Sequence, residues 1–201
     1  MDEANTILSY WFYDNYRLDI LRKLITKQKP WWFNSTSQID DEIIEKFSSM
    51  LDMENDGKYD DWIYCKHKNL AYIILFDQFP RHMFRNKAEA FSFDKKALYA
   101  CMCGLNNGFD KHLNTFQKYF FYLPLMHSEN KYIQMLSKVY YDKLISGFLF
   151  PPKAKQFVRK FVYRHKEIID RFGRYPHRNE ALGRLSSAEE LAFLKEPMSS
   201  F

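Results

Sequence analysis

Residues 70–79, with the sequence LAYIILFDQF, constrain the fold more than any other part of the chain. The stretch is almost wholly apolar, and a helix that is hydrophobic on all sides must be enclosed by other elements. Ten residues can also form a buried strand, but no neighbouring stretch alternates between polar and apolar residues to pair with it. The stretch therefore predicts a central buried helix, and Pro80 is expected to break it.

The rest of the chain has a helical period. Apolar residues recur every three or four positions, which is typical of amphipathic helices. This spacing predicts helices over residues 40–51, 92–107, 116–123, 129–145 and 153–172. Ser92 is the expected N-cap of helix 92–107, Pro124 is expected to close helix 116–123, and Ser186-Ser187 is expected to cap a short last helix. The predicted inner face of helix 129–145 consists of Ile133, Leu136, Val139, Tyr140 and Leu144.

These elements amount to about eight helices and no convincing strand. Their connections, of roughly two to ten residues, suit antiparallel helix pairs packed in sequence order. Six glycines and seven prolines in 201 residues are few for a sandwich or a barrel. We therefore predict an all-α protein that folds as one domain over residues 1–201.

Composition narrows the class of protein further. With 46% hydrophobic and 18% aromatic residues, the chain can bury enough apolar surface to fold. It contains no apolar run long enough to span a membrane, and its first residues, MDEANTILSYWF, do not resemble a secretory signal. A cytoplasmic protein without membrane attachment is expected. Three cysteines, including the pair Cys101 and Cys103, are interpreted as structural thiols, because no second pair completes a zinc site.

Positive charge is concentrated in one segment. Residues 153–184 contain ten lysines and arginines against three acids, a net charge of +7, whereas the whole chain carries +5. Such a segment indicates an anionic ligand. The total is too small for the strongly basic footprint of a nucleic-acid-binding protein, so a nucleic-acid partner is disfavoured.

Three polar stretches, residues 77–85, 124–129 and 171–184, stand at the ends of apolar helices beside proline or glycine. A structural interpretation is available for each. Asp77 can pair with Arg81 one helical turn away, Glu129 suits the first turn of a helix, and His82 is most simply a structural histidine. However, the arginines of residues 171–184 outnumber the acids near them, and burying an unpaired guanidinium costs several kcal/mol. An anion pocket explains that excess better than internal pairing does.

At these stretches the sequence resembles the domain-of-unknown-function 924 family. The resemblance is carried by LAYIILFDQFPRHMFR (residues 70–85), YFFYLPLMHSEN (119–130), RFGRYPHRNEALGR (171–184) and LSSAEELAFL (185–194). It implies an all-helical fold similar to tetratricopeptide-type helix pairs, and it implies no activity. The polar residues that match its motifs are Asp77, Gln78, Arg81, Arg85, His127, Glu129, Arg171, Arg174, His177, Arg178, Asn179 and Arg184.

The leading functional hypothesis is a pocket for a small anionic ligand that bears phosphate or carboxylate. His127 or His177 is the candidate general base or acid, with Glu129 or Asp77 orienting it. Hydrolysis or group transfer suits this set, although no nucleophile motif accompanies it, and whether the protein is an enzyme or uses a cofactor is left open. The candidate ligand-binding residues are Gln78, Arg81, Arg85, Arg171, Arg174, Arg178, Asn179 and Arg184.

The alternative is a non-catalytic interaction module whose basic helix face, within residues 153–164, binds an acidic peptide. Metal binding is disfavoured, because His127 and Glu129 are not spaced three or four residues apart as ligands on one helix are. The pocket hypothesis predicts that all three polar stretches line one cavity. It also predicts that Arg174→Ala and Arg178→Ala leave the fold nearly intact.

Overall fold

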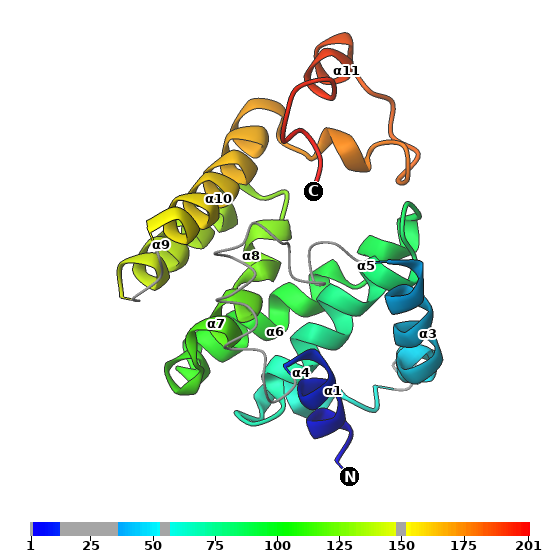
Figure 1. The fold of residues 1–201 in the computed structure, drawn as a ribbon, viewed down its shortest axis with the longest axis vertical. Helices are drawn as coiled ribbons and strands as arrows, with labels where there is room; N and C mark the ends of the chain where they lie inside the picture. Colours follow the sequence, from blue (N-terminus) through cyan, green and yellow to red (C-terminus); the bar gives the residue numbers. More distant parts are fainter. Residues whose placement is uncertain (1, 13–35, 53–56, 148–151) are drawn as a thin grey trace. The chain divides into compact units, whose positions relative to one another are not determined.

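The computed structural model describes residues 2–12, 36–52, 57–147 and 152–201. Over these ranges the chain is built from α-helices and short 3-10 helices with one π-helical turn, and it contains no strand (Figure 1). The all-α prediction is confirmed. The chain divides into two compact units, unit 1 (residues 1–85 and 89–121) and unit 2 (residues 86–88 and 122–201). A single domain over residues 1–201 stays a prediction. Among the helices described, none has both the length and the apolar character needed to cross a membrane.

The two units differ in the length of their helices. Unit 1 contains α1 (Glu3–Trp11), α3 (Ser37–Asp52), α4 (Asn69–Ile73), α5 (Phe79–Met83), α6 (Asp94–Asn106) and α7 (Thr115–Phe121). Unit 2 contains α8 (Leu123–His127), α9 (Lys131–Ser146), α10 (Pro152–Phe172) and α11 (Ala188–Phe193). Short 3-10 helices cover Asp60–Tyr64, Ala88–Phe91, Phe109–His112 and Pro176–Arg178.

Residues 69–83 form the predicted buried helix. A π-helical turn (Ile74–Gln78) joins α4 to α5, and every residue from 70 to 80 is buried. The predicted break at Pro80 is wrong. The N–H of Phe79 bonds to the carbonyl of Ile74 five residues back, and Pro80 follows in the first turn of α5. A proline is tolerated in a first turn, because an N–H there has no partner within the helix.

Other helices of unit 1 enclose this buried helix. α4 packs against α1, α6 and α7, while α5 packs against α3. Aromatic rings fill the contacts: Phe79 stacks on Phe47 with centroids 4.4 Å apart and meets the edge of Trp11 at 5.6 Å. Leu75 has no exposed surface. The central position predicted for residues 70–79 is thus the observed one within unit 1.

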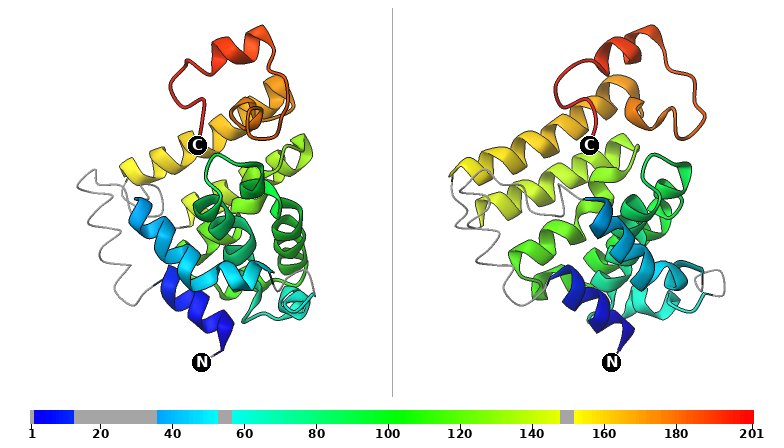
Figure 2. Two further views of the ribbon diagram at one scale, coloured as in Figure 1. Left: turned by 90° about the vertical axis from the view of Figure 1, so that its right-hand side faces the viewer. Right: turned by 45° about the vertical axis from the view of Figure 1, so that its right-hand side comes forward.

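In unit 2, α9 and α10 lie side by side, and α8 packs against both (Figures 1 and 2). At the far end of α10, Ile168 and Ile169 pack with Tyr175 and with Phe193 of α11. The segment after α11 returns towards α10 (Figure 2). Residues 122–201 therefore build a small core of their own, and this core holds the polar loop of residues 173–187 in place.

The buried face of α9 coincides with the predicted one only at Leu144. Val139 is 46% exposed, whereas Gln134 and Ser137 are almost fully buried. The buried residues of the helix are Gln134, Ser137, Tyr141, Leu144 and Ile145. Polar residues can occupy an inner face when they meet polar backbone. The Gln134 amide does so, donating to the carbonyl oxygens of Met126 (2.6 Å) and Ser128 (2.7 Å).

Helix ends follow the predictions in part. Ser187 caps α11 and forms a capping box with Glu190, as the sequence indicates. Ser92 is not the N-cap of α6, because Phe93 holds that position and no side chain caps the helix. Pro124 does not close a helix but lies in the first turn of α8. In both cases the observed helix boundary lies only a few residues from the predicted one.

Candidate functional site

The first polar stretch forms its own cluster in unit 1. Asp77 lies in the π-helical turn with no exposed surface, and the Gln78 amide donates to its carboxylate. Arg81 bridges two acids, with 3.5 Å between Nη1 and Asp77 Oδ1 and 2.8 Å between Nη2 and Asp94 Oδ1. The predicted pair of Asp77 and Arg81 therefore exists, and Asp94, from the start of α6, completes it.

Arg85 and His82 converge on one carboxylate of α3. Arg85 donates to both oxygens of Asp40, at 2.9 to 3.1 Å, and His82 Nδ1 lies 2.9 Å from Asp40 Oδ1. Burial lowers the pKa of His82, although the hydrogen bond and charge of Asp40 act to raise it. This arrangement ties α5 to α3. It supports the structural interpretation of His82 and gives Arg85 an internal partner.

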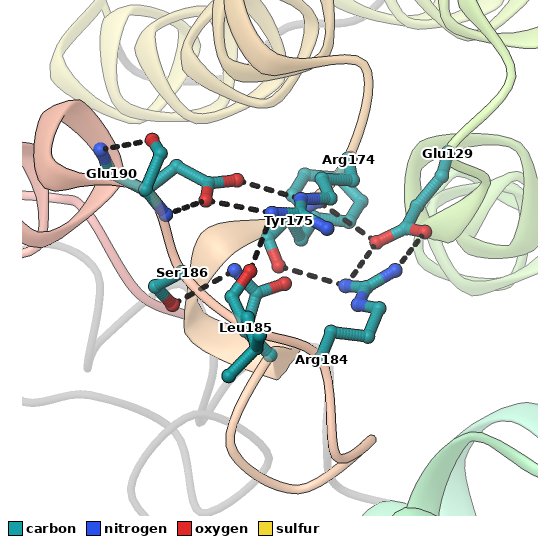
Figure 3. Close-up of polar contacts among 9 residues, drawn as sticks. Glu129, Arg174, Tyr175, Arg184, Leu185, Ser186 and Glu190 are labelled. Carbon is teal, nitrogen blue, oxygen red and sulfur yellow. Dashed lines mark hydrogen bonds and ion pairs between the residues drawn. The ribbon is translucent and has the colours of Figure 1, made fainter.

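The second and third polar stretches meet in unit 2 (Figure 3). Arg184 donates to both oxygens of Glu129, at 2.7 and 2.9 Å, and also to the Tyr175 carbonyl at 3.1 Å. The Tyr175 N–H donates to Glu129 at 2.8 Å. Burial acts to raise the pKa of Glu129, but the hydrogen bonds from Arg184 and Tyr175 outweigh it and lower the pKa. Glu129 is therefore an ionised anchor for the loop of residues 173–187 rather than a proton donor at neutral pH.

A second ion pair holds the same loop from the other side (Figure 3). Arg174 donates to both oxygens of Glu190, at 2.7 and 2.8 Å, and to the carbonyl of Leu185 at 2.8 Å. The hydrogen bond from Arg174 lowers the pKa of Glu190 to about 2. Asn179 donates to Ser186 at 3.0 Å. Since Glu190 is only 2% exposed, Arg174→Ala would strand a buried acid, which argues against the nearly intact fold expected from the sequence.

Internal pairing therefore accounts for several of the arginines that prompted the anion hypothesis. Arg171 also forms an ion pair within the chain, with 2.9 Å between its Nε and Glu189 Oε1. Arg178 is buried, with 6% of its surface exposed, and its guanidinium lies over the ring of Tyr175, 4.7 Å from the centroid. Its charge acts on two nearby histidines, His165 and His177.

Three histidines lie close enough together in unit 2 to influence one another electrostatically. Burial lowers the pKa of His165 of α10 well below its usual value, and the charges of His127, His177 and Arg178 add to that effect. Burial and the charge of Arg178 lower the pKa of His177 to about 4, although Glu129 and the backbone of Ser199 act to raise it. His177 is therefore neutral at pH 7.

Several buried polar atoms of unit 2 have no hydrogen-bond partner among the described residues. They include Gln134 Oε1, Ser137 Oγ and His177 Nδ1. Tyr175 connects Gln134 with His177: its hydroxyl accepts from Gln134 at 2.8 Å and donates to the Met126 carbonyl, and its ring lies 5.4 Å from that of His177. Buried polar atoms normally have hydrogen-bond partners, so several without one in the same unit require an explanation. We define the histidine cluster as His127, His165, His177, Arg178, Tyr175 and Gln134.

Two members of the histidine cluster, Gln134 and His165, lie outside the polar stretches that the sequence analysis selected. Gln134 and Ser137 lie on the face of α9 that was taken to be exposed, and His165 lies on the apolar face of α10, between Phe161 and Ile168 in the helical repeat. A signal for His165 was available, because an ionisable side chain on an apolar stripe is unusual. No comparable signal distinguished Gln134 or Ser137 before the buried face of α9 was known.

The structure thus brings the second and third polar stretches together within unit 2, and the first stretch forms a cluster within unit 1. A cavity shared by all three stretches stays a prediction. Among the residues that the structure describes, no group of three or more histidine, cysteine, aspartate or glutamate side chains is arranged to hold a metal ion.

Comparisons with known proteins agree with this architecture. A family model described as "Bacterial protein of unknown function (DUF924)" matches residues 7–198. A solved structure of a protein of unknown function from Agrobacterium tumefaciens is similar to the chain, with 27% sequence identity and a TM-score of 0.72. The match covers 90% of this chain and 99% of that one. No curated protein matches the sequence.

Proposed function

The chain belongs to the DUF924 family of bacterial proteins of unknown function, and we propose that its histidine cluster binds a small anion bearing a phosphate or carboxylate group. The observation that carries this proposal is the buried, unpartnered Nδ1 of His177 beside the cation Arg178. A bound phosphate or carboxylate group would give that nitrogen a hydrogen-bond partner and would place a negative charge next to Arg178.

The charges around the cluster favour an anion over a cation. Glu129 is the acid whose charge reaches His177, and its carboxylate is already bonded to Arg184 and to the Tyr175 N–H. Arg178 is buried, and its positive charge acts on the ring of His177. Its planar fork suits two oxygens of one phosphate or carboxylate group. Two other arginines, Arg174 and Arg184, fix the loop of residues 173–187 through ion pairs with Glu190 and Glu129.

The proposal extends from binding to catalysis at the same site. Because the pKa of His177 is about 4, its neutral imidazole can accept a proton at pH 7 but cannot serve as a general acid. Hydrolysis or group transfer at a bound ester is the reaction that this base would support, with water or a second substrate as the nucleophile. Glu129 positions the loop through Arg184 and does not act on the ligand itself.

The experiment is calorimetric titration of the protein with inorganic phosphate and with succinate at pH 7. We expect at least one of them to bind, with a Kd below about 1 mM. Arg178→Gln should weaken binding by about tenfold or more, because a charge-assisted hydrogen bond is lost. Arg159→Gln is the matched control, since Arg159 is exposed on α10 outside the cluster, and it should bind as the wild type does.

Thermal unfolding of each variant shows whether lost binding reflects lost structure. His177→Phe keeps a ring of similar shape but removes both ring nitrogens, so it tests the cluster independently of Arg178. Absence of binding by the wild type, or wild-type affinity in both Arg178→Gln and His177→Phe, would contradict the proposal.

A non-catalytic interaction module is the second candidate, and the first half of α10 favours it. Residues 152–166 contain no acid, and Lys153, Phe157, Arg159 and Lys160 are exposed there. Such a face suits an acidic peptide. If it binds one, Lys153→Glu combined with Lys160→Glu should abolish binding of a synthetic polyglutamate peptide and leave phosphate binding unchanged. A tetratricopeptide-like helix arrangement and a cytoplasmic location stay predictions.

A further inference from the structure

One side of α9 presents a row of large apolar side chains to solvent. Tyr132, Met135 and Val139 are 69%, 56% and 46% exposed, respectively. Their spacing of three and four residues places them on the same side of the helix. Exposed apolar side chains are common singly, whereas a row at this spacing is the pattern with which one helix contacts another. We call Tyr132, Met135 and Val139 the α9 row.

A lysine stands at each end of the α9 row. Lys131 precedes Tyr132 in the chain, and Lys143 follows Val139 by about one helical turn. Both lysines are exposed. Within the described ranges neither of them forms an ion pair with an acid. The row is therefore an apolar strip with a positive charge at either end.

The surface next to the α9 row is basic as well. Asp142 is the only acid of α9, and Lys138 neutralises it at 2.7 Å. Lys138 also lies over the ring of Tyr163 of α10, 4.6 Å from the centroid, and the Tyr163 hydroxyl donates to Asp142 at 3.2 Å. These contacts join the outer surface of α9 to that of α10, which lies beside it (Figure 2). Residues 152–166 of α10 contain no acid, so a partner on this surface gains from negative charge.

We propose that the α9 row docks an amphipathic helix whose apolar side is flanked by acidic residues. The apolar side of that helix covers the row, and its acids lie beside Lys131 and Lys143. A second copy of this chain is disfavoured as the occupant, because two paired α9 helices would bring their lysines together. The docking site is separate from the histidine cluster and does not require it. It also differs from a basic face that binds polyglutamate, because apolar contacts are essential to it.

The test uses a synthetic peptide that forms a helix with leucines along one side and glutamates along the others. We expect it to bind the full chain with a Kd below about 100 μM in calorimetric titration at low salt. A peptide with lysine in place of each glutamate keeps the leucine side but should not bind, because its charges repel Lys131 and Lys143. A peptide of the same composition in scrambled order has no apolar side and should not bind either.

Substitutions of apolar side chains locate the peptide on α9. Met135→Ser and Val139→Ser should each weaken binding about tenfold, because the peptide no longer buries the same apolar surface. Leu191→Ser is the matched control, since Leu191 lies on α11 and is 54% exposed, close to the value for Met135. It should bind the peptide as the wild type does. All three side chains are exposed, so circular dichroism should show an unchanged fold.

Substitutions of lysines test the charge of the partner. Lys131→Gln combined with Lys143→Gln should weaken binding about threefold to tenfold, because two ion pairs at the edge of the interface are lost. The loss should shrink at high salt, where such pairs are screened. Lys195→Gln removes an exposed lysine away from α9 and is the control.

Binding of the glutamate peptide that is weakened in Met135→Ser and Val139→Ser, but not in Leu191→Ser, would support the docking site. Absence of binding by the wild type, equal binding of the lysine peptide, or wild-type affinity in both serine variants would overturn it. A wild-type dimer that Met135→Ser dissociates, seen by sedimentation, would overturn it in favour of a second copy. Binding to phosphatidylserine vesicles that the same substitution abolishes would overturn it in favour of a membrane surface. Phosphate titration of these variants tests the anion site independently.

Discussion

Leu75→Ala is expected to lower the free energy of unfolding by about 2–5 kcal/mol. Leu75 lies in the π-helical turn with no exposed surface, and the helices around it cannot close fully over the space that a smaller side chain leaves. The cost therefore includes both the lost burial and the remaining cavity. Urea denaturation measures the effect, with fluorescence of the buried Trp11 and Trp62 reporting on unit 1.

Leu185→Ala is the matched control, because Leu185 is 92% exposed and the same atoms are removed. Its effect should stay within about 0.5 kcal/mol. Equal denaturation midpoints for the two variants would show that residues 70–79 are not the centre of the unit 1 core.

Arg184→Met should destabilise unit 2 by about 1.5–3 kcal/mol, the usual worth of hydrogen bonds to a charged group. The substitution removes both guanidinium contacts to Glu129 and leaves that half-buried carboxylate with the Tyr175 N–H alone. The pKa of Glu129 should then rise, since burial raises it and Arg184 no longer opposes that effect. Circular dichroism during urea denaturation measures the stability.

Two further variants identify the source of that effect. Arg159→Met removes an exposed arginine of α10 and should change stability by less than about 0.5 kcal/mol. The double variant Glu129→Leu, Arg184→Met should be more stable than the sum of the single effects predicts, because no carboxylate is left unpaired. Additive effects in this cycle would mean that the two side chains do not depend on each other.

The fold could be predicted from the sequence where side-chain composition decides it. An unbroken apolar stretch such as residues 70–79 must be enclosed, whatever surrounds it. Pro80 and Pro124 were misjudged for one physical reason. A proline blocks only a helix interior, and whether it lies in an interior or in a first turn depends on the hydrogen-bond register of the preceding turn. That register is not visible in the residues themselves.

The partners of the arginines could not be predicted, because the pairing is not local. Glu190 is 16 residues from Arg174, and Glu129 is 55 residues from Arg184. Counting acids near each arginine therefore overestimated the unpaired charge. The same limit applies to α9, where the apolar side chains indicated one face and contacts with the carbonyls of Met126 and Ser128 buried another.

The most direct test of the anion site is the pKa of His177, measured by NMR with and without saturating phosphate. Without ligand the pKa should be about 4. The ion pair of Glu190, whose carboxyl pKa is about 2, should keep its loop folded in that range. Phosphate beside Arg178 and Nδ1 favours the protonated ring, so the pKa should rise by at least about one unit, and phosphate should bind more tightly as the pH falls through this range. An identical pKa in both conditions would contradict an anion site at the histidine cluster.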